Sequence, residues 1–401
     1  MLFGPNEIFK GTIIEKLYWF ITEGALQYLL KLYQIIFRKE FNVNDNVIFR
    51  IIYKCRYRFI QAFYLTISTS GIIFFFYTAL DRLPNKYLGP IHFVIIPMVI
   101  AFLYISFYVA CVSDPGVITK ENVDAVCKHF KYDYILFSER TCKTCNLIKP
   151  ARSKHCSSCG HCIAKSDHHC SWINNCVGYL NFRYFLLFLI ANVIICLYGC
   201  YLCTYLIKAR GDSLGLDTGY AINRFTRQLE KIGLKEYSQI MLKEEPILSG
   251  LVLFLGASNF IVLGFILYQS YLNIVDGTTS NELAKWGRLE NRLMKGETFI
   301  TKTYVGDQEI KENKKESENK NEKNEKNEQI NKNYSNNTTK QRKEKESKPE
   351  MTEFYDGIIK NGYRYSIIRS FDDVTNIYNQ GIKNNFKEMI FPNVKIFKGK
   401  N

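Results

Sequence analysis

Four long apolar runs constrain this chain more than any other feature. They occupy residues 59–80, 90–112, 182–207 and 247–275. Each run is close to or above the roughly 20 residues that an α-helix needs to cross the hydrocarbon core of a bilayer. Charged residues are nearly absent inside the runs, and buried helices of soluble proteins are seldom so uniformly apolar. The sequence therefore predicts an all-α integral membrane protein with four transmembrane helices.

The basic residues around these runs bear on orientation. Four spans place both termini and the segment 113–181 on one side of the membrane. That segment holds nine Lys or Arg, whereas the opposite loop 81–89 holds only Arg82 and Lys86. Positive charge favours the cytosolic side. The outer loop 208–246 carries seven basic residues but also several acids, so the charges favour a cytosolic segment 113–181 without deciding it.

The spans and their flanks predict five regions. The N-terminal cytosolic segment has apolar residues at helical intervals from Ile8 to Phe37, which suits an amphipathic helix on the bilayer or one packed on the protein. A Lys/Glu/Asn-rich insert in the C-terminal region is too polar to fold. The predicted regions are the N-terminal segment 1–58, the first two spans 59–112, the cysteine-rich segment 113–181, the last two spans 182–275 with luminal loop 208–246, and the cytosolic region 276–401 with its disordered insert 306–350.

The cysteine-rich segment has the spacing of a metal site. Paired Cys-x-x-Cys ligands with nearby histidines are typical of structural zinc, whereas disulfide frameworks are typical of small secreted chains. Zinc would supply the folding energy that so short a segment cannot obtain from a core of its own. Two ions need eight ligands, and the spacing is also compatible with a catalytic zinc. The eleven candidates are Cys142, Cys145, His155, Cys156, Cys159, His161, Cys162, His168, His169, Cys170 and Cys176.

The stretch from Asp167 to Cys170 combines residues that can perform nucleophilic chemistry. A thiolate attacks carbonyl carbon, and a neighbouring histidine can take the proton of the thiol. An aspartate bonded to that histidine would fix its tautomer. Consecutive residues rarely meet in a regular helix or strand, so we expect a tight turn pinned by metal ligands. From the residues alone, Cys170 is either a nucleophile or a further thiol ligand.

The segment Cys142–Cys176, with Asp167-His168-His169-Cys170 inside it, resembles the cysteine-rich domain of the DHHC family of protein S-acyltransferases (palmitoyltransferases). Four spans with this domain between the second and third also fit that family. Further similar motifs are Asp114-Pro115-Gly116 (DPG), Thr279-Ser280-Asn281-Glu282 (T-T-x-E) and segment 378–391 with Gly381 and Asn385 (the C-terminal motif centred on an Asn). Ser171 replaces the usual Pro, and Ser280 the usual second Thr unless Thr278-Thr279 is the matching pair.

The resemblance implies a role for each reactive residue. Cys170 would carry the acyl group, His168 would be the general base, and Asp167 would orient His168. His161 remains a competitor of His155 as a ligand. The implied zinc ligands are Cys142, Cys145, His155 and Cys162 for one ion, and Cys156, Cys159, His169 and Cys176 for the other.

The resemblance also implies the substrates. A long-chain acyl-CoA such as palmitoyl-CoA would acylate Cys170, and cysteines of membrane-associated proteins would accept the group at the cytosolic face. Arg183 and Lys154 are candidate contacts for the CoA phosphates, or ordinary interfacial charges. The expected location is an endomembrane (Golgi or ER) or the plasma membrane. The alternative function is a non-catalytic, zinc-bearing membrane scaffold. The net charge of +15 would suit a nucleic-acid-binding protein, but four spans would not, so no nucleic-acid partner is expected.

Overall fold

The computed structural model describes residue 16 and residues 47–222, 227–304, 358–360 and 362–398. The chain forms two compact units. The first comprises the described parts of Met1–Asn122, Ser153–Asn281 and Asn379–Asn401. The second comprises those of Val123–Arg152 and Glu282–Tyr378. The predicted N-terminal amphipathic helix, apart from Lys16, and the predicted insert 306–350 lie outside the described residues.

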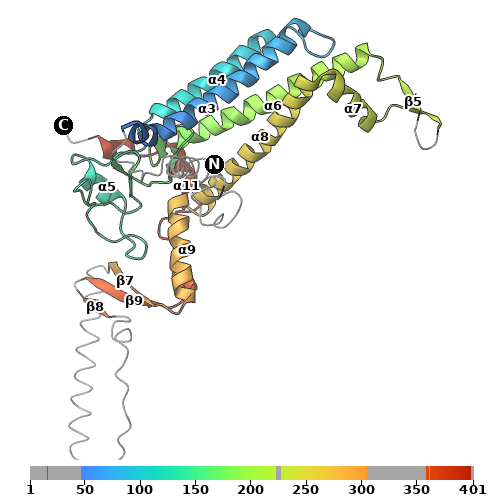
Figure 1. Cartoon of the computed structure of the whole chain (residues 1–401). Helices are drawn as coiled ribbons and strands as arrows, with labels where there is room; N and C mark the ends of the chain where they lie inside the picture. The colour runs from blue at the N-terminus through green and yellow to red at the C-terminus, as the bar shows by residue number, and fades with distance from the viewer. Residues whose placement is uncertain (1–15, 17–46, 223–226, 305–357, 361, 399–401) are drawn as a thin grey trace, which may run out of the picture. The chain divides into compact units, whose positions relative to one another are not determined.

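Four long helices lie side by side in the first unit (Figure 1). They are α3 (Val47–Ala79), α4 (His92–Val112), α6 (Phe182–Ser213) and α8 (Pro246–Ser270), and α8 continues as the π-helix η4 (Tyr271–Val275). Four segments within them are long and apolar enough to cross a membrane: Tyr57–Arg82, His92–Val112, Phe182–Ser213 and Pro246–Val275. The prediction of four spans is confirmed, and the chain is a multi-pass membrane protein. Helix α6 continues beyond its apolar run, to Ser213.

The four helices are apolar on all sides, and only part of each surface packs inside the unit. Helix α6 packs against both α4 and α8. One buried cluster, which includes Phe107, Phe185 and Phe265, lies at the end near the cysteine-rich strands. A second, with Leu88 and Leu202, lies farther along the spans. A helix that is apolar all round belongs in a protein core or a membrane, so the large exposed apolar side chains of the spans suit contact with lipid.

Ion pairs connect the ends of the spans that lie away from the cysteine-rich segment. Arg82, in the 3-10 helix η3 (Leu80–Arg82), contacts Glu245 at 2.7 Å, and Lys86 contacts Asp212 at 3.1 Å. Between α6 and α8 the chain forms the hairpin β5 (Tyr220–Ile222) and β6 (Leu229–Lys231), followed by α7 (Leu234–Glu244). These elements occupy the loops 81–89 and 208–246 predicted from the sequence.

The part of the cysteine-rich segment in the first unit forms two antiparallel hairpins. Strand β1 (Lys154–Cys156) pairs with β2 (His161–Ile163), and β3 (His168–Cys170) pairs with β4 (Asn175–Val177). Short strands of this kind hold consecutive side chains on alternate faces. Each hairpin therefore separates neighbouring Cys and His residues onto opposite faces.

The turn after α4 holds these hairpins to the membrane helices. Asp114 Oδ1 accepts hydrogen bonds from the backbone N–H groups of Gly116 and Val117 at 2.8 and 3.0 Å. Gly116 has φ +95°, a conformation that favours glycine. A Cβ on Gly178 would lie 2.5 Å from the carbonyl oxygen of Pro115, so only glycine permits this approach. Asp114 is thus a hydrogen-bonding tether.

The second unit contains α5 (Val123–His129), α9 (Ser280–Met294) from Glu282 onward, and a three-stranded antiparallel sheet. The sheet has the order β7 (Phe299–Tyr304), β9 (Tyr363–Ile368), β8 (Ile359–Lys360). The second unit also contains the short 3-10 helix η5 (Phe371–Asp373). Strands β7 and β8 both pair with β9 in an antiparallel arrangement.

The C-terminal part of the first unit is α11 (Ile382–Ile390) with the 3-10 helix η6 (Val394–Phe397). Asn385 is buried, and its Nδ2 donates to the Ile274 carbonyl at 3.0 Å and to Asn379 Oδ1 at 2.8 Å. Gly381 precedes the helix with φ +83°. The asparagine noted in the C-terminal motif therefore ties α11 to the end of the fourth span.

Candidate active site and metal centres

Strand alternation separates the residues of the Asp-His-His-Cys stretch. In the β3–β4 hairpin, His169 lies opposite Cys176, whereas His168 lies opposite Val177 and Cys170 opposite Asn175. His168 and Cys170 therefore share one face, and His169 lies on the other. The expected tight turn is wrong: a regular strand brings His168 and Cys170 together by placing them two residues apart.

Asp167 and Cys170 lie on either side of His168 in the sequence and both act on its imidazole. Asp167 Oδ2 lies 2.6 Å from His168 Nδ1, and Cys170 shares the strand face of His168 and interacts favourably with the protonated imidazole. Asp167 and Cys170 are both buried. Burial lowers the pKa of His168, but the interactions with Asp167 and Cys170 outweigh it and raise that pKa to about 10. These interactions favour the protonated form of the imidazole.

Asp167 receives two further hydrogen bonds from Ser280. The Ser280 backbone N–H donates to Oδ1 at 2.7 Å, and the Ser280 hydroxyl donates to Oδ2 at 3.1 Å. The Thr279 hydroxyl instead donates to the carbonyl oxygen of Ser166 at 3.3 Å, and the Thr278 hydroxyl to that of Asp276. Of the two alignments considered from the sequence, Thr279-Ser280-Asn281-Glu282 is the one that reaches the carboxylate.

The opposite face of the β3–β4 hairpin forms a group that could hold a metal ion. Its members are Cys156, Cys159, His169 and Cys176, whose candidate ligand atoms all lie within 4.8 Å of one another. His169 Nδ1 lies 3.4 to 3.7 Å from the three sulfurs. The edge of a tetrahedral zinc site with these ligands is roughly 3.5 to 3.8 Å, so three thiols and one imidazole fit such an ion.

The other ligand set that the resemblance implies, Cys142, Cys145, His155 and Cys162, is divided between the two units, and each pair is described within its own unit. Cys142 and Cys145 belong to the second unit, where Asn146 N–H donates to the Cys142 carbonyl at 2.9 Å in a tight cysteine turn. His155 and Cys162 belong to the first unit and lie opposite each other in the β1–β2 hairpin, with His155 Nδ1 3.9 Å from Cys162 Sγ. The competing His161 is exposed and lies outside both ligand sets.

The two candidate phosphate contacts differ in their surroundings. Lys154 is exposed on β1. Arg183 lies in the first turn of α6, where its Nη1 donates to the Ile390 carbonyl at 3.2 Å and its guanidinium lies 4.7 Å from the Tyr184 ring centroid. Part of the donor capacity of Arg183 is therefore used in holding α11.

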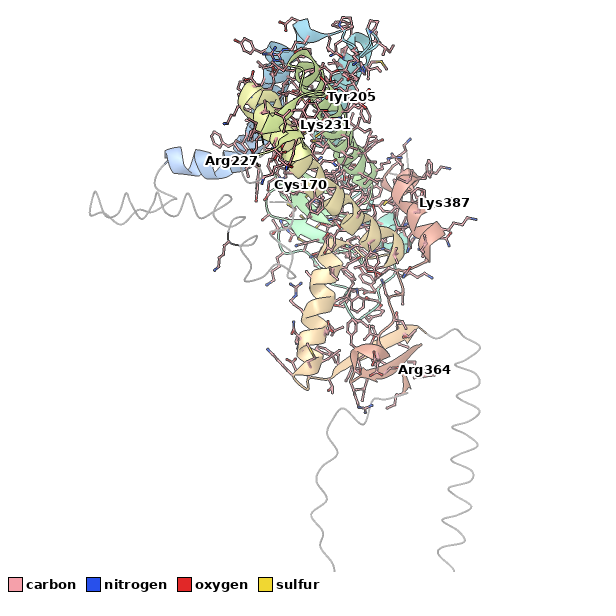
Figure 2. The ribbon with its side chains drawn as sticks, turned by 90° about the vertical axis from the view of Figure 1, so that its right-hand side faces the viewer. Cys170, Tyr205, Arg227, Lys231, Arg364 and Lys387 are labelled. Atoms are coloured by element: carbon pink, nitrogen blue, oxygen red, sulfur yellow. The ribbon has the colours of Figure 1, made fainter. Side chains whose placement is uncertain are left out.

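An apolar cavity begins at the thiol and extends among the membrane helices. Its volume is about 410 Å³, and its lining includes Cys170 and Trp172, then Phe185, Leu103 and Leu202. All four spans contribute. Its lining on α6 runs from Phe185 to Cys203, which corresponds to about 27 Å along a helix. Figure 2 labels Cys170 where the strands meet the membrane helices. The cavity can enclose a long aliphatic chain attached at Cys170.

Several residues that hold this site have no local signal in the sequence. Asn175 Nδ2 donates to the carbonyls of Ala110 and Ser113, which ties β4 to the end of α4. Lys165 contacts Glu388 of α11 at 2.7 Å, and both side chains are mostly buried. Glu388 is 223 positions from Lys165, so no local pattern relates the two.

The comparisons with known proteins agree with this geometry. Residues 135–287 match the family model described as DHHC palmitoyltransferase. The chain is 29% identical to "Palmitoyltransferase SWF1" of Yarrowia lipolytica over 300 residues, 74% of this chain and 70% of that protein. It is 34% identical to "Palmitoyltransferase swf1" of Schizosaccharomyces pombe over 237 residues, 59% of this chain and 62% of that protein.

A shorter match is to "Palmitoyltransferase ZDHHC4" of Mus musculus, 42% identical over 100 residues, 24% of this chain and 29% of that protein. The chain thus spans less than two thirds of the yeast relative from Schizosaccharomyces pombe and of the mouse relative. The matched family region includes Asp167–Cys170 and both ligand sets. Residues 135–287 are therefore similar to the DHHC palmitoyltransferases, and the similarity to the curated palmitoyltransferases includes this region.

Proposed function

We propose that this chain is a protein S-acyltransferase that carries a long-chain acyl group, such as palmitoyl, on Cys170. The observation that carries the proposal is the position of the Cys170 thiol. It shares a strand face with His168, which is hydrogen-bonded to Asp167, and it lines an apolar cavity among the spans. A zinc-bearing scaffold would need neither the pair nor the cavity.

In the first step, Cys170 Sγ attacks the carbonyl carbon of an acyl-CoA thioester. The new carbon–sulfur bond forms as the bond to the CoA sulfur breaks. His168, which holds the proton originally shared with the thiol, can give it to the leaving CoA sulfur. Asp167 keeps the imidazole in one orientation and stabilises its positive charge.

In the second step, a cysteine thiol of a membrane-associated protein attacks the Cys170 thioester. His168 takes the proton of the incoming thiol, the acyl group moves to the new sulfur, and Cys170 is released. The acyl chain favours the cavity because each buried CH2 contributes about 0.8 kcal/mol. CoA carries several phosphates and stays in water, where Lys154 and Arg183 remain candidate contacts.

One structural zinc ion would be held by Cys156, Cys159, His169 and Cys176. A second would be held by Cys142, Cys145, His155 and Cys162, the set that the family resemblance implies. Closed four-ligand sites supply folding energy and leave no open position for substrate. His169 and Cys176 of one group lie on the hairpin that carries His168 and Cys170. The ion's contribution is therefore to hold this hairpin, while the residues on its other face perform the chemistry.

The site faces the cytosol in this proposal, because acyl-CoA is a cytosolic substrate and basic residues gather in segment 113–181. The enzyme would reside in an endomembrane or in the plasma membrane. A glycosylation acceptor inserted into the segment between β5 and β6 tests the orientation. Glycosylation of that acceptor is expected. Glycosylation of an acceptor placed in segment 113–181, and not of the one between β5 and β6, would mean that the orientation is the opposite of the proposed one.

Acyl-enzyme formation tests the function directly. The full-length protein, incubated with labelled palmitoyl-CoA, should form an adduct that hydroxylamine removes. Cys170→Ser should abolish the adduct. Cys111→Ala is the matched control, because Cys111 packs against the same buried cluster without lining the cavity. Equal labelling of wild type and Cys170→Ser would refute the role of Cys170, and no labelling of the wild type would favour the scaffold.

A further inference from the structure

Two buried polar residues lie at the end of the fourth span, close to the proposed catalytic chain. Gln269 is 3% exposed on the last turn of α8, and Asn273 is 4% exposed in the π-helix η4. A buried polar group in an apolar segment is costly unless its hydrogen bonds are made. Each of these two side chains therefore needs a hydrogen-bond partner inside the protein.

The hydrogen bonds from these residues lead to the Asp167 carboxylate. Gln269 Nε2 lies 3.1 Å from Ser280 Oγ, and Ser280 Oγ lies 3.1 Å from Asp167 Oδ2. Asn273 Nδ2 lies 3.4 Å from Gln269 Oε1 and 3.1 Å from the Gln269 carbonyl oxygen. Asn273 is thus the first member of a chain that runs through Gln269 and Ser280 to Asp167.

The chemistry of the groups sets the direction of this chain. An ionised carboxylate only accepts, so the single O–H of Ser280 is donated to Asp167. The Ser280 oxygen must then accept, and Gln269 Nε2 donates to it at 3.1 Å, whereas Gln269 Oε1 is a more distant alternative acceptor for the hydroxyl at 3.5 Å. The Gln269 side-chain oxygen in turn accepts from Asn273. Each group then donates toward Asp167, and an apolar side chain at position 269 would remove the amide donor that orients the Ser280 oxygen.

The local backbone also sets this arrangement apart from an ordinary span. The regular α8 ends at Ser270, and residues 271–275 form a π-helix. Such turns are rare and frequently lie at functional sites, because they re-aim the side chains of one helical face. Asn273 lies within the π-helix and holds both the backbone and the side chain of Gln269.

We propose that Gln269, held by Asn273, is a positioning residue for acyl transfer. It keeps the Ser280 hydroxyl directed at Asp167, so that Asp167 holds His168 in line with Cys170. The inference rests on the proposed acyltransferase function and adds two residues of the fourth span to it. Gln269 touches neither the acyl cavity lining nor the thiol, so its effect passes through Ser280.

The test compares full-length Gln269→Met with wild type in single-turnover formation of the Cys170 thioester from palmitoyl-CoA. Methionine keeps the length and volume of glutamine without its amide. The rate constant at saturating palmitoyl-CoA should fall about tenfold, the effect of one lost buried hydrogen bond. The half-saturating concentration and the zinc content should stay unchanged. Asn259→Met is the matched control. Asn259 is a partly buried polar residue of the same helix, and it takes no part in the hydrogen bonds that lead to Asp167.

A double-mutant cycle separates positioning from general damage to the fold. In a Ser280→Ala background, Gln269→Met should cause no additional slowing, whereas in a Ser280→Thr background it should still slow the reaction. Equal slowing in the Ser280→Ala and wild-type backgrounds would overturn the inference, as would an unchanged rate for Gln269→Met. If Gln269→Met loses zinc, the rate of thioester formation is measured for Asn273→Ala instead. A rate equal to that of wild type overturns the proposal, and a severalfold fall supports it. A wild-type protein that forms no thioester would instead refute the acyltransferase function itself.

Discussion

At the residue scale, the two adjacent histidines have different surroundings because they lie on a strand. His168 is hydrogen-bonded to Asp167 and shares a strand face with Cys170, while His169 lies among the sulfurs of Cys156, Cys159 and Cys176. The side-chain period of two in a β-strand produces this division without any special backbone conformation. The ligand set implied by the family resemblance assigns the two histidines in the same way, and the roles themselves remain predictions.

Substitution of each histidine tests the division. His168→Ala should slow thioester formation by about 10² to 10⁴, the usual contribution of a positioned acid–base group, with the zinc content unchanged. His169→Ala should release one zinc ion, because it removes one of four ligands. Thioester rate and zinc per protein are measured on the same samples. The reverse pattern, with zinc lost from His168→Ala only, would exchange the two roles.

A second residue-scale effect concerns the buried ion pair of the second unit. Arg152 Nε and Nη2 donate to the two carboxylate oxygens of Glu282, both at 2.6 Å, and both side chains are 2% exposed. Glu282 belongs to the T-T-x-E-like motif and acts as a tether. Removal of one partner leaves a buried charge without its counterion.

Arg152→Met should therefore destabilise the second unit by about 3 to 5 kcal/mol, whereas Arg152→Met combined with Glu282→Met should recover much of that loss. Protease susceptibility of the second unit under native conditions is the measurement. Equal susceptibility of the single and double variants would show that the pair acts through something other than charge burial.

At the element scale, helix α9 carries a lysine in an unfavourable place. Lys285 Nζ lies 3.5 Å from the Phe137 ring centroid and has no hydrogen-bond partner in the described part of the chain. Burial, together with the charge of Arg140, lowers the pKa of Lys285 to about 7. The unfolded chain would hold this proton up to about pH 10. Stability therefore rises with pH between about 7 and 10, where only the unfolded state binds the proton.

Lys285→Met should stabilise the second unit at pH 7 and remove this pH dependence. Cleavage of wild type and variant is compared at pH 7 and at pH 9, so that the pH dependence of the protease cancels. The difference between the two proteins should shrink at pH 9. Lys295→Met is the control, because Lys295 is exposed just after the same helix, and it should show no such change. If the difference in cleavage between wild type and Lys285→Met grew with pH, the assigned burial of Lys285 would be contradicted.

At the scale of the whole molecule, the four spans form both the membrane anchor and the wall of the apolar cavity. Every span contributes lining residues. Ile100 lines the cavity on α4, twelve residues or about 18 Å along the helix from Val112, which ends at the cysteine-rich segment. Bulk added there would shorten the space that a chain bound at Cys170 can fill.

Ile100→Phe should therefore shift the preference toward shorter acyl chains. The ratio of thioester formation rates for palmitoyl-CoA and lauroyl-CoA should fall about tenfold, since overpacking costs about 1 to 3 kcal/mol. Met98→Phe is the control, because Met98 is 64% exposed on the same helix. An unchanged ratio for Ile100→Phe would mean that the acyl chain lies outside this cavity.

The sequence by itself determined the features that depend on local pattern. Apolar runs about as long as the bilayer core is thick can hardly be anything except spans. Cys-x-x-Cys pairs with histidines in one short segment indicate metal groups, because the ligands of each half are neighbours in the chain. The Asp-His-His-Cys stretch indicated the family resemblance and the candidate nucleophile in the same way.

Only the tertiary structure decided which distant residues complete the site. Ser280 is 113 positions from Asp167, and Glu282 is 130 positions from Arg152. Gln269 appeared in the sequence only as a polar residue of a span, with nothing to relate it to Ser280 or to the catalytic stretch. Such pairings depend on how helices and hairpins pack, and packing leaves no periodic trace in either partner. The cavity is a property of four helices together, so no single span could reveal it.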